Sequence, residues 1–171
     1  MLIIQDTFQS QYGPAIQKGI LALESLGETL PTEDLQNVLG AEVQKMMGAI
    51  GEKPIPSLID EPVMEDPEKI IATQLLVNLI PTAYLSGQME LYAVVSAKII
   101  NLALVHGHSP TSSHGYSNYG GVIASMMGQY QAAYQFGQLA LTLTEKFDNM
   151  YLRCKDSMLF ANFMSPWVKH I

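Results

Sequence analysis

Apolar residues recur at steps of three and four positions along most of the chain, which is the spacing of one face of an α-helix. Such stretches predict helices at about residues 7–26, 32–51, 67–85, 89–105, 111–127, 130–147 and 151–163. Pro14 is awkward inside the first of these, so its regular part is expected to begin close to Pro14, and Pro81 is expected to kink or end the third. No segment keeps the two-residue alternation of a half-buried strand for any useful length. The sequence therefore predicts an all-α fold of about seven helices in antiparallel pairs, forming a single domain over residues 1–171.

The segment of residues 52–67 breaks this helical pattern, because several prolines punctuate it and acidic residues lie between them. A regular helix is excluded there by Pro54, Pro56, Pro62 and Pro67. The loop is predicted to pack onto the helices through its apolar residues Leu58, Ile59, Val63 and Met64. At its end, Asp66 can cap the following helix, with Pro67 in the first helical turn.

Two of the predicted helices carry the same pattern of small residues behind an aromatic residue. The first copy is Tyr12, Ala15, Gly19, Ala22 and Leu23, and the second is Tyr130, Ala133, Gly137, Ala140 and Leu141. Small residues at these steps share one face of a helix and let a neighbouring helix approach closely. The pattern indicates an internal repeat built from packed helix pairs, and an irregular helical bundle is the alternative.

The second copy, together with the helix before it, resembles a tetratricopeptide repeat. The positions that carry this resemblance are Gly121, Gly128, Tyr130, Ala133 and Ala140. The chain departs from the family where Ser117 takes the place of a large aromatic, and where Gly137 and Gly19 take the place of a bulky residue. The motif is clearest over residues 115–145, so the resemblance implies a divergent tetratricopeptide-like repeat.

A wider resemblance includes residues 130–141, the sequence Gly107-His108-Ser109 and the proline-rich loop with Met64. These segments resemble the helical region of large bacterial signalling proteins that join a serine/threonine kinase, a P-loop ATPase, helical repeats, a GAF sensor and a histidine kinase. The resemblance implies a non-catalytic segment of a longer protein, between the ATPase and the sensor. The first predicted helix matches the second member of a repeat pair and leaves no room for a first member, which also suggests an excised segment.

The composition narrows the classes of partner. The chain has a net charge of −7, with 16 acidic residues against 9 basic ones, which argues against binding to nucleic acid or to an anionic membrane. The longest apolar stretch, residues 93–105, is interrupted by polar residues and is too short to span a membrane. Only 15% of residues are charged, so either the protein is compact or part of its apolar surface is covered by something else. The single cysteine, Cys154, leaves no intrachain disulfide and favours a cytoplasmic location.

Several residues could carry chemistry, and each has a plainer explanation. His106, His108 and His114 could ligate zinc, but no cysteine or acidic residue lies nearby in sequence, which favours a polar loop and helix start. Four acidic residues of the proline-rich loop could bind calcium, but they lack the alternating oxygen ligands and the central glycine of a calcium loop. They are Asp60, Glu61, Glu65 and Asp66. Residues 115–121 are glycine-rich but lack the Gly-Lys-Ser/Thr of a phosphate loop. Cys154, between Arg153 and Lys155, is predicted to be a half-buried structural thiol.

The sequence thus predicts no catalytic residue, no cofactor and no bound metal. The leading hypothesis is a helical scaffold that binds protein, either a flanking domain or a separate partner, and whose incomplete repeat favours self-association. A second hypothesis is a stand-alone bundle that holds a small apolar ligand between its helices. A third is a metal-dependent helical enzyme that uses the histidine-rich loop.

Overall fold

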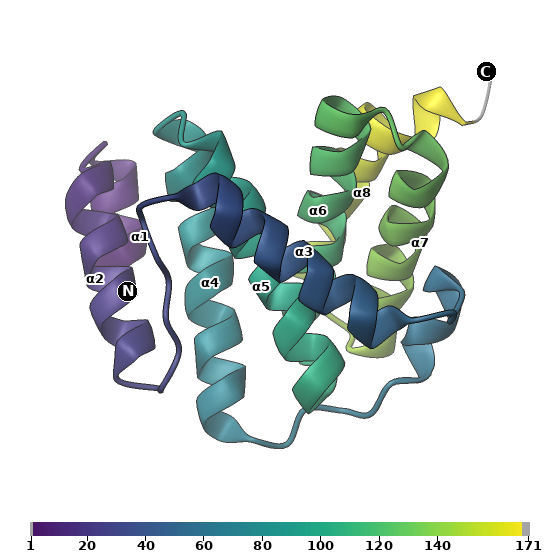
Figure 1. Ribbon diagram of the computed structural model, residues 1–171, viewed down its shortest axis with the longest axis horizontal. Helices are drawn as coiled ribbons and strands as arrows, with labels where there is room; N and C mark the ends of the chain where they lie inside the picture. Colours follow the sequence, from purple (N-terminus) through teal and green to yellow (C-terminus); the bar gives the residue numbers. More distant parts are fainter. Residues whose placement is uncertain (1, 169–171) are drawn as a thin grey trace.

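The computed structural model describes residues 2–168, and this range is all-α (Figure 1). Its eight α-helices are α1 (Leu2–Phe8), α2 (Tyr12–Glu24), α3 (Leu35–Ile50), α4 (Pro67–Leu85), α5 (Met89–His106), α6 (Ser112–Met127), α7 (Tyr130–Lys146) and α8 (Met150–Leu159). Three short segments complete it: the 3₁₀ helix η1 (Ile55–Asp60), the π-helical turn η2 (Phe160–Met164) and the 3₁₀ turn η3 (Ser165–Trp167). The prediction of an all-α fold is confirmed.

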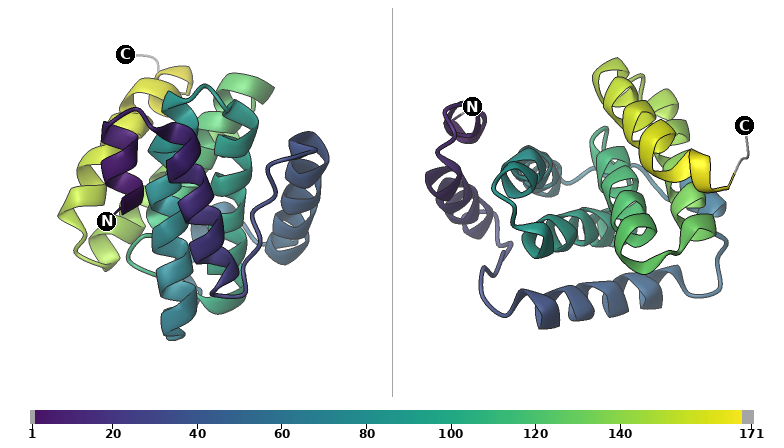
Figure 2. Two further views of the ribbon diagram at one scale, coloured as in Figure 1. Left: turned by 90° about the vertical axis from the view of Figure 1, so that its left-hand side faces the viewer. Right: turned by 90° about the horizontal axis from the view of Figure 1, so that it is seen from above.

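The helices follow one another as packed pairs. α1 packs on α2, α4 on α5 and α6 on α7, while α8 packs against both members of the last pair. Contacts between α2 and α4 and between α5 and α6 join successive pairs. α3 lies apart from this succession and crosses the outer side of α5, opposite α8 (Figure 2).

The first helix differs from its prediction. Instead of one helix over residues 7–26, the chain turns at Ser10, whose φ of 58° is in the left-handed region. The residues before the turn form α1, which packs on α2 and is tied to α4 by the hydroxyls of Thr7 and Thr82, 2.7 Å apart. A short separate helix therefore precedes α2, and the prediction of one continuous helix over residues 7–26 was wrong. The helix count of about seven was low for the same reason.

The predicted start of α4 at Asp66 and Pro67, and the predicted turn at Ser86 and Gly87, are confirmed. A carboxylate oxygen of Asp66 accepts a hydrogen bond from the backbone N–H of Glu68 at 2.9 Å, as an N-cap does. The turn after the helix lies at Ser86 and Gly87, where Gly87 has a φ of 74°. Pro81 lies inside α4 without ending it, and it is exposed on the helix surface.

The proline-rich loop packs onto the bundle. Leu58 in η1 and Met64 are buried, although Val63 is exposed. The loop pairs with the α5–α6 connection, where the N–H of His108 donates to the carbonyl of Pro62 at 2.7 Å and the N–H of Met64 donates to the carbonyl of His108 at 2.9 Å. Gly107 permits this approach, because a Cβ there would lie 2.6 Å from the Pro62 carbonyl oxygen. Backbone hydrogen bonds therefore hold the loop in place.

Helix α5 forms the centre of the protein and contributes to both clusters of buried apolar side chains. Among the described residues it is the one helix long and apolar enough to cross a membrane, but 67% of it is buried within the protein, as in a core helix. α3 is fastened across it by polar contacts. Asn101 Nδ2 lies 2.6 Å from a carboxylate oxygen of Glu42, and Lys98 Nζ lies 3.3 Å from the other.

Candidate binding groove

A groove of about 550 Å³ lies between α4 and α8. α6 forms its floor, and the start of α5 and turn η2 complete it. No residue of α3 lines it, and α3 lies on the opposite side of the α5 and α6 layer (Figure 2). The groove is thus the inner face of the successive helix pairs, lined mainly by α4, α6 and α8.

The walls of the groove are largely apolar. They include three methionines, two tyrosines and a phenylalanine among the side chains Ile80, Tyr84, Met89, Tyr92, Val122, Met126, Met158, Leu159 and Phe163. Several of these are exposed to solvent, including Tyr84 at 55% and Met126 at 56%. Methionine is flexible and polarisable, so such walls can adapt to apolar occupants of different shapes.

A chain of hydrogen bonds crosses the floor of the groove from α5 to α8. The Tyr92 hydroxyl donates to Asn118 Oδ1 at 2.8 Å, and Asn118 Nδ2 donates to the carbonyl of His114 at 2.6 Å. His114 Nδ1 then lies 2.7 Å from Asp156 Oδ1. Burial raises the pKa of Tyr92, which keeps its hydroxyl protonated and able to donate. These bonds fix the polar groups of the floor before any partner arrives.

His114 and Asp156 form a buried acid–base pair. Asp156 is 0% exposed and its Oδ2 finds no hydrogen-bond partner among the described residues. Its Oδ1 contacts Nδ1 of His114, so the other ring nitrogen, Nε2, points away from the pair. Within residues 2–168, no hydroxyl or thiol is hydrogen-bonded to Nε2.

The charge of the groove differs from that of the whole chain. Lys155 is its one lining residue with a permanent charge, and neither aspartate nor glutamate lines it. Lys155 Nζ lies 4.3 Å from the centre of the Tyr151 ring, which places it at the α8 edge. The groove is thus an apolar surface with one lysine at its α8 edge.

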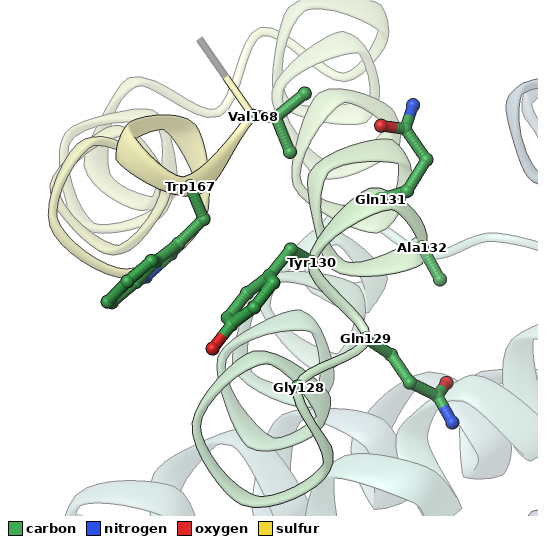
Figure 3. A pocket seen from close by; sticks show the side chains of 7 residues that line it. All are labelled: Gly128, Gln129, Tyr130, Gln131, Ala132, Trp167 and Val168. Carbon is green, nitrogen blue, oxygen red and sulfur yellow. The ribbon is translucent and has the colours of Figure 1, made fainter. Parts of the chain in front are cut away.

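A second hollow lies where α6 turns into α7, against the turn η3 (Figure 3). The rings of Tyr130 and Trp167 stack there with centroids 4.9 Å apart. Figure 3 shows Gln129, Gln131 and Ala132 pointing away from the stacked rings, so side chains do not converge on a ligand. We interpret this contact as an anchor of the end of the chain on α7.

The residues of the predicted repeat lie mostly in helix–helix contacts. Those fully covered by neighbouring helices are Ala15, Gly19, Ala133, Gly137 and Ala140. Tyr12 and Ala22 are half-buried, and Tyr130 is 38% exposed. Gly128 lies outside the contacts and ends α6 with a φ of 65°.

Gly121 corrects one detail of the repeat. A Cβ on Gly121 would meet no atom within 4 Å, because this residue faces the open groove. The close approach of α6 and α7 falls on Gly120 instead, where a Cβ would lie 3.1 Å from the carbonyl oxygen of Ala133. The glycine of the close helix contact is therefore Gly120, one residue before the predicted one, and Gly121 lines the groove.

The candidate ligands named from sequence do not come together. His108 is buried against Tyr116, with Nε2 and the hydroxyl oxygen 3.0 Å apart, whereas His114 pairs with Asp156. Among the described residues, no group of three histidine, cysteine or acidic side chains could hold a metal. Cys154 is exposed, so the prediction of a half-buried thiol was wrong.

Sequence reasoning missed the groove and its acid–base pair. Asp156 lies 42 positions from His114, and only the packing of α8 on α6 brings them together. The available signal was an aspartate on the apolar side of a helix, in register with Leu152.

Comparisons of the chain with protein-family models, curated proteins and solved structures find no match.

Proposed function

We propose that this chain is a non-catalytic helical interaction module, and that the groove between α4 and α8 is its binding face. The observation that carries the proposal is an apolar surface left open along the inner face of packed helix pairs. Proteins that stack helix pairs use such concave faces to hold partners. A divergent tetratricopeptide-like repeat, in the cytoplasm, is the form of the fold that we propose.

The resemblance noted in the sequence gives this module its setting. We propose that it links the ATPase and sensor regions of a bacterial multidomain signalling kinase, and that its partner is a protein segment from a flanking domain or another protein. The low fraction of charged residues, 15%, supports a partner that covers apolar surface. Self-association through exposed apolar residues of α1, such as the 86% exposed Phe8, belongs to the same proposal.

A small apolar ligand is the second candidate for the groove. Its volume of about 550 Å³ supports this candidate, because ligand sites of proteins commonly measure about 300–1,000 Å³. A metal-dependent enzyme has less support, since two of the three histidines named from sequence, His108 and His114, are engaged with Tyr116 and Asp156.

Site-specific photo-crosslinking in the intact protein tests the proposed binding face. A photoreactive phenylalanine replaces Gly121, where a side chain points into open space in the groove. The matched control replaces Gly40 on α3, an exposed glycine that also has no atom within 4 Å of its Cβ position. We expect crosslinks to one defined protein segment from the first position and not from the second.

Reconstitution completes the test. The crosslinked segment, made as a purified peptide, should bind the protein and lose affinity for a Gly121→Phe variant, while Gly40→Phe should bind like the parent protein. Crosslinks that arise equally from both positions, or a peptide that ignores Gly121→Phe, would show that the groove is not the binding face. A reading frame without kinase, ATPase or sensor motifs on either side would overturn the proposed setting.

A further inference from the structure

Helix α3 is held to the rest of the protein differently from the other helices. Each of the other described α-helices packs on at least two other elements, whereas α3 makes its extensive contacts with α5 alone. In Figure 2 it lies outside the layers of the helix pairs, with a connection at each end. Leu30 before it and Leu58 after it are themselves buried, so the flanking segments have anchors of their own.

The inward face of α3 is only shallowly covered. Only Met46 and Ile50, near its C-terminal end, are fully buried. The other inward positions keep part of their surface exposed, and they are Leu35, Val38, Leu39, Glu42 and Val43. Few buried contacts are typical of segments that open locally before the whole protein unfolds.

The middle of α3 meets two polar residues of α5, a mostly apolar helix. Lys98 Nζ lies 3.3 Å from one carboxylate oxygen of Glu42, and Asn101 Nδ2 donates to the other at 2.6 Å and to the Glu42 carbonyl at 2.9 Å. Lys98 is 9% exposed and Asn101 is 3% exposed, so α5 carries a covered site complementary to a carboxylate. Asn101 Oδ1 has no hydrogen-bond partner among the described residues, so α3 leaves part of this site unused.

We propose that α3 is a displaceable internal ligand, and that the face of α5 beneath it binds an amphipathic helix of a partner protein that carries an acidic residue on its apolar face. α3 is the template for this partner, because Glu42 lies between Val38 one turn before it and Met46 one turn after it. While α3 is in place it blocks the site, so the partner binds only the fraction of molecules in which α3 has left α5. No residue of α3 lines the groove between α4 and α8, so this second surface does not depend on the proposed binding face.

Native-state hydrogen exchange of the intact protein tests whether α3 is displaceable. The amides of α3 should exchange at least about tenfold faster than those of α5 and respond weakly to urea, since a local opening exposes little surface. Glu42→Gln should speed the exchange of α3 by about five- to tenfold more and leave α5 unchanged, because it removes the charge that Lys98 faces. Glu52→Gln, at an exposed position just after α3, is the matched control and should change neither helix. Amides of α3 that exchange only together with those of α5 would make α3 a fixed part of the core and overturn the inference.

A labelled peptide of residues 33–52 supplies the chemistry of the partner and tests the face of α5. It should bind the intact Glu42→Gln protein about five- to tenfold more tightly than the parent protein, because the weakened internal helix leaves the site more often. Changing Lys98→Met in the Glu42→Gln protein should weaken binding of the peptide, and a peptide that itself carries Glu42→Gln should bind weakly to both. Circular dichroism establishes that each variant protein is folded.

The outcomes separate this inference from the proposed function. No binding of the peptide to the Glu42→Gln protein, or binding that ignores Lys98→Met, overturns the site on α5 and leaves the groove between α4 and α8 standing. Adding Gly121→Phe to the Glu42→Gln protein should leave peptide binding unchanged, and a loss of binding would place the peptide in the groove and also overturn the inference. Loss of the defined crosslink from position 121 bears on the groove alone.

Discussion

Acidification should destabilise the protein through His108, which holds the proline-rich loop to the bundle. Burial, helped by the positive charge of Lys146 and opposed by Glu61, lowers the pKa of His108 from its ordinary 6.5 to about 4. The side chain is 0% exposed, its Nε2 lies 3.0 Å from the Tyr116 hydroxyl oxygen, and burial raises the pKa of that hydroxyl. The folded protein therefore favours the uncharged histidine.

The sign and size of the effect follow from proton linkage. Between pH 4 and pH 6.5 the unfolded chain binds a proton that the folded protein excludes, so stability falls as the pH falls. The neutral ring contributes about 3 kcal/mol to stability above the unfolded pKa, and about 2 kcal/mol of this is lost between about pH 7 and about pH 5. Carboxylates titrate in the same range, so a single curve does not isolate the histidine.

Urea unfolding of matched variants at both pH values isolates the contribution of His108 to the pH dependence. His108→Gln removes the titrating ring, and the difference in unfolding free energy between the two pH values should shrink by about 2 kcal/mol relative to the parent protein. His106→Gln, at a half-buried position of the same connection, should retain the full difference. If His108→Gln kept the pH dependence of the parent protein, the buried neutral histidine would be refuted as its source.

Three further changes probe the packing. Gly121→Ala should stabilise the protein by about 0.5–1 kcal/mol, since it reduces backbone entropy in an open stretch of α6. Gly115→Ala should destabilise it by about 1–3 kcal/mol, because the new Cβ meets the side chain of Ile99 on α5; thermal unfolding of both variants checks the opposite signs. Glu42→Leu should cost about 1–3 kcal/mol by leaving Lys98 without its partner, and the double variant with Lys98→Met should recover part of the loss in a double-mutant cycle.

The helices could be predicted from the sequence because each carries a local signal. The apolar period places them, and the boundaries of α4 follow from Asp66 and Gly87, whose roles are set by their own backbone. The start of α2 is marked by Pro14 in its first turn, but the separate helix α1 was missed because Ser10, which makes the turn with a left-handed φ, is neither a glycine nor a proline. The exposure of Cys154 depends on how the short helix α8 turns against α6, which no local pattern fixes.

The groove could not be predicted because its parts come from four helices far apart in the chain. Tyr92, Asn118 and Asp156 read separately as ordinary polar residues of apolar helices. Only the angle at which α8 meets α6 brings the Asp156 carboxylate within 2.7 Å of His114. A pair that is buried and incompletely hydrogen-bonded costs stability, so its presence at the floor of an open groove favours a role in recognition over one in folding.

The two copies of the small-residue pattern perform the same physical task at opposite ends of the protein. A Cβ on Gly19 would lie 2.7 Å from a methyl carbon of Leu79, and one on Gly137 would lie 2.5 Å from the ring of Phe160. In each case the glycine lies on the second helix of a pair and admits a side chain from the element that packs against it next, α4 in one case and η2 in the other. Both glycines stand where the tetratricopeptide pattern has a bulky residue. This departure thus lies at the position where each helix pair contacts the next element. The contact between Gly137 and Phe160 packs η2 against α7, and α8 packs on both. Gly137 therefore also helps to position the α8 wall of the groove.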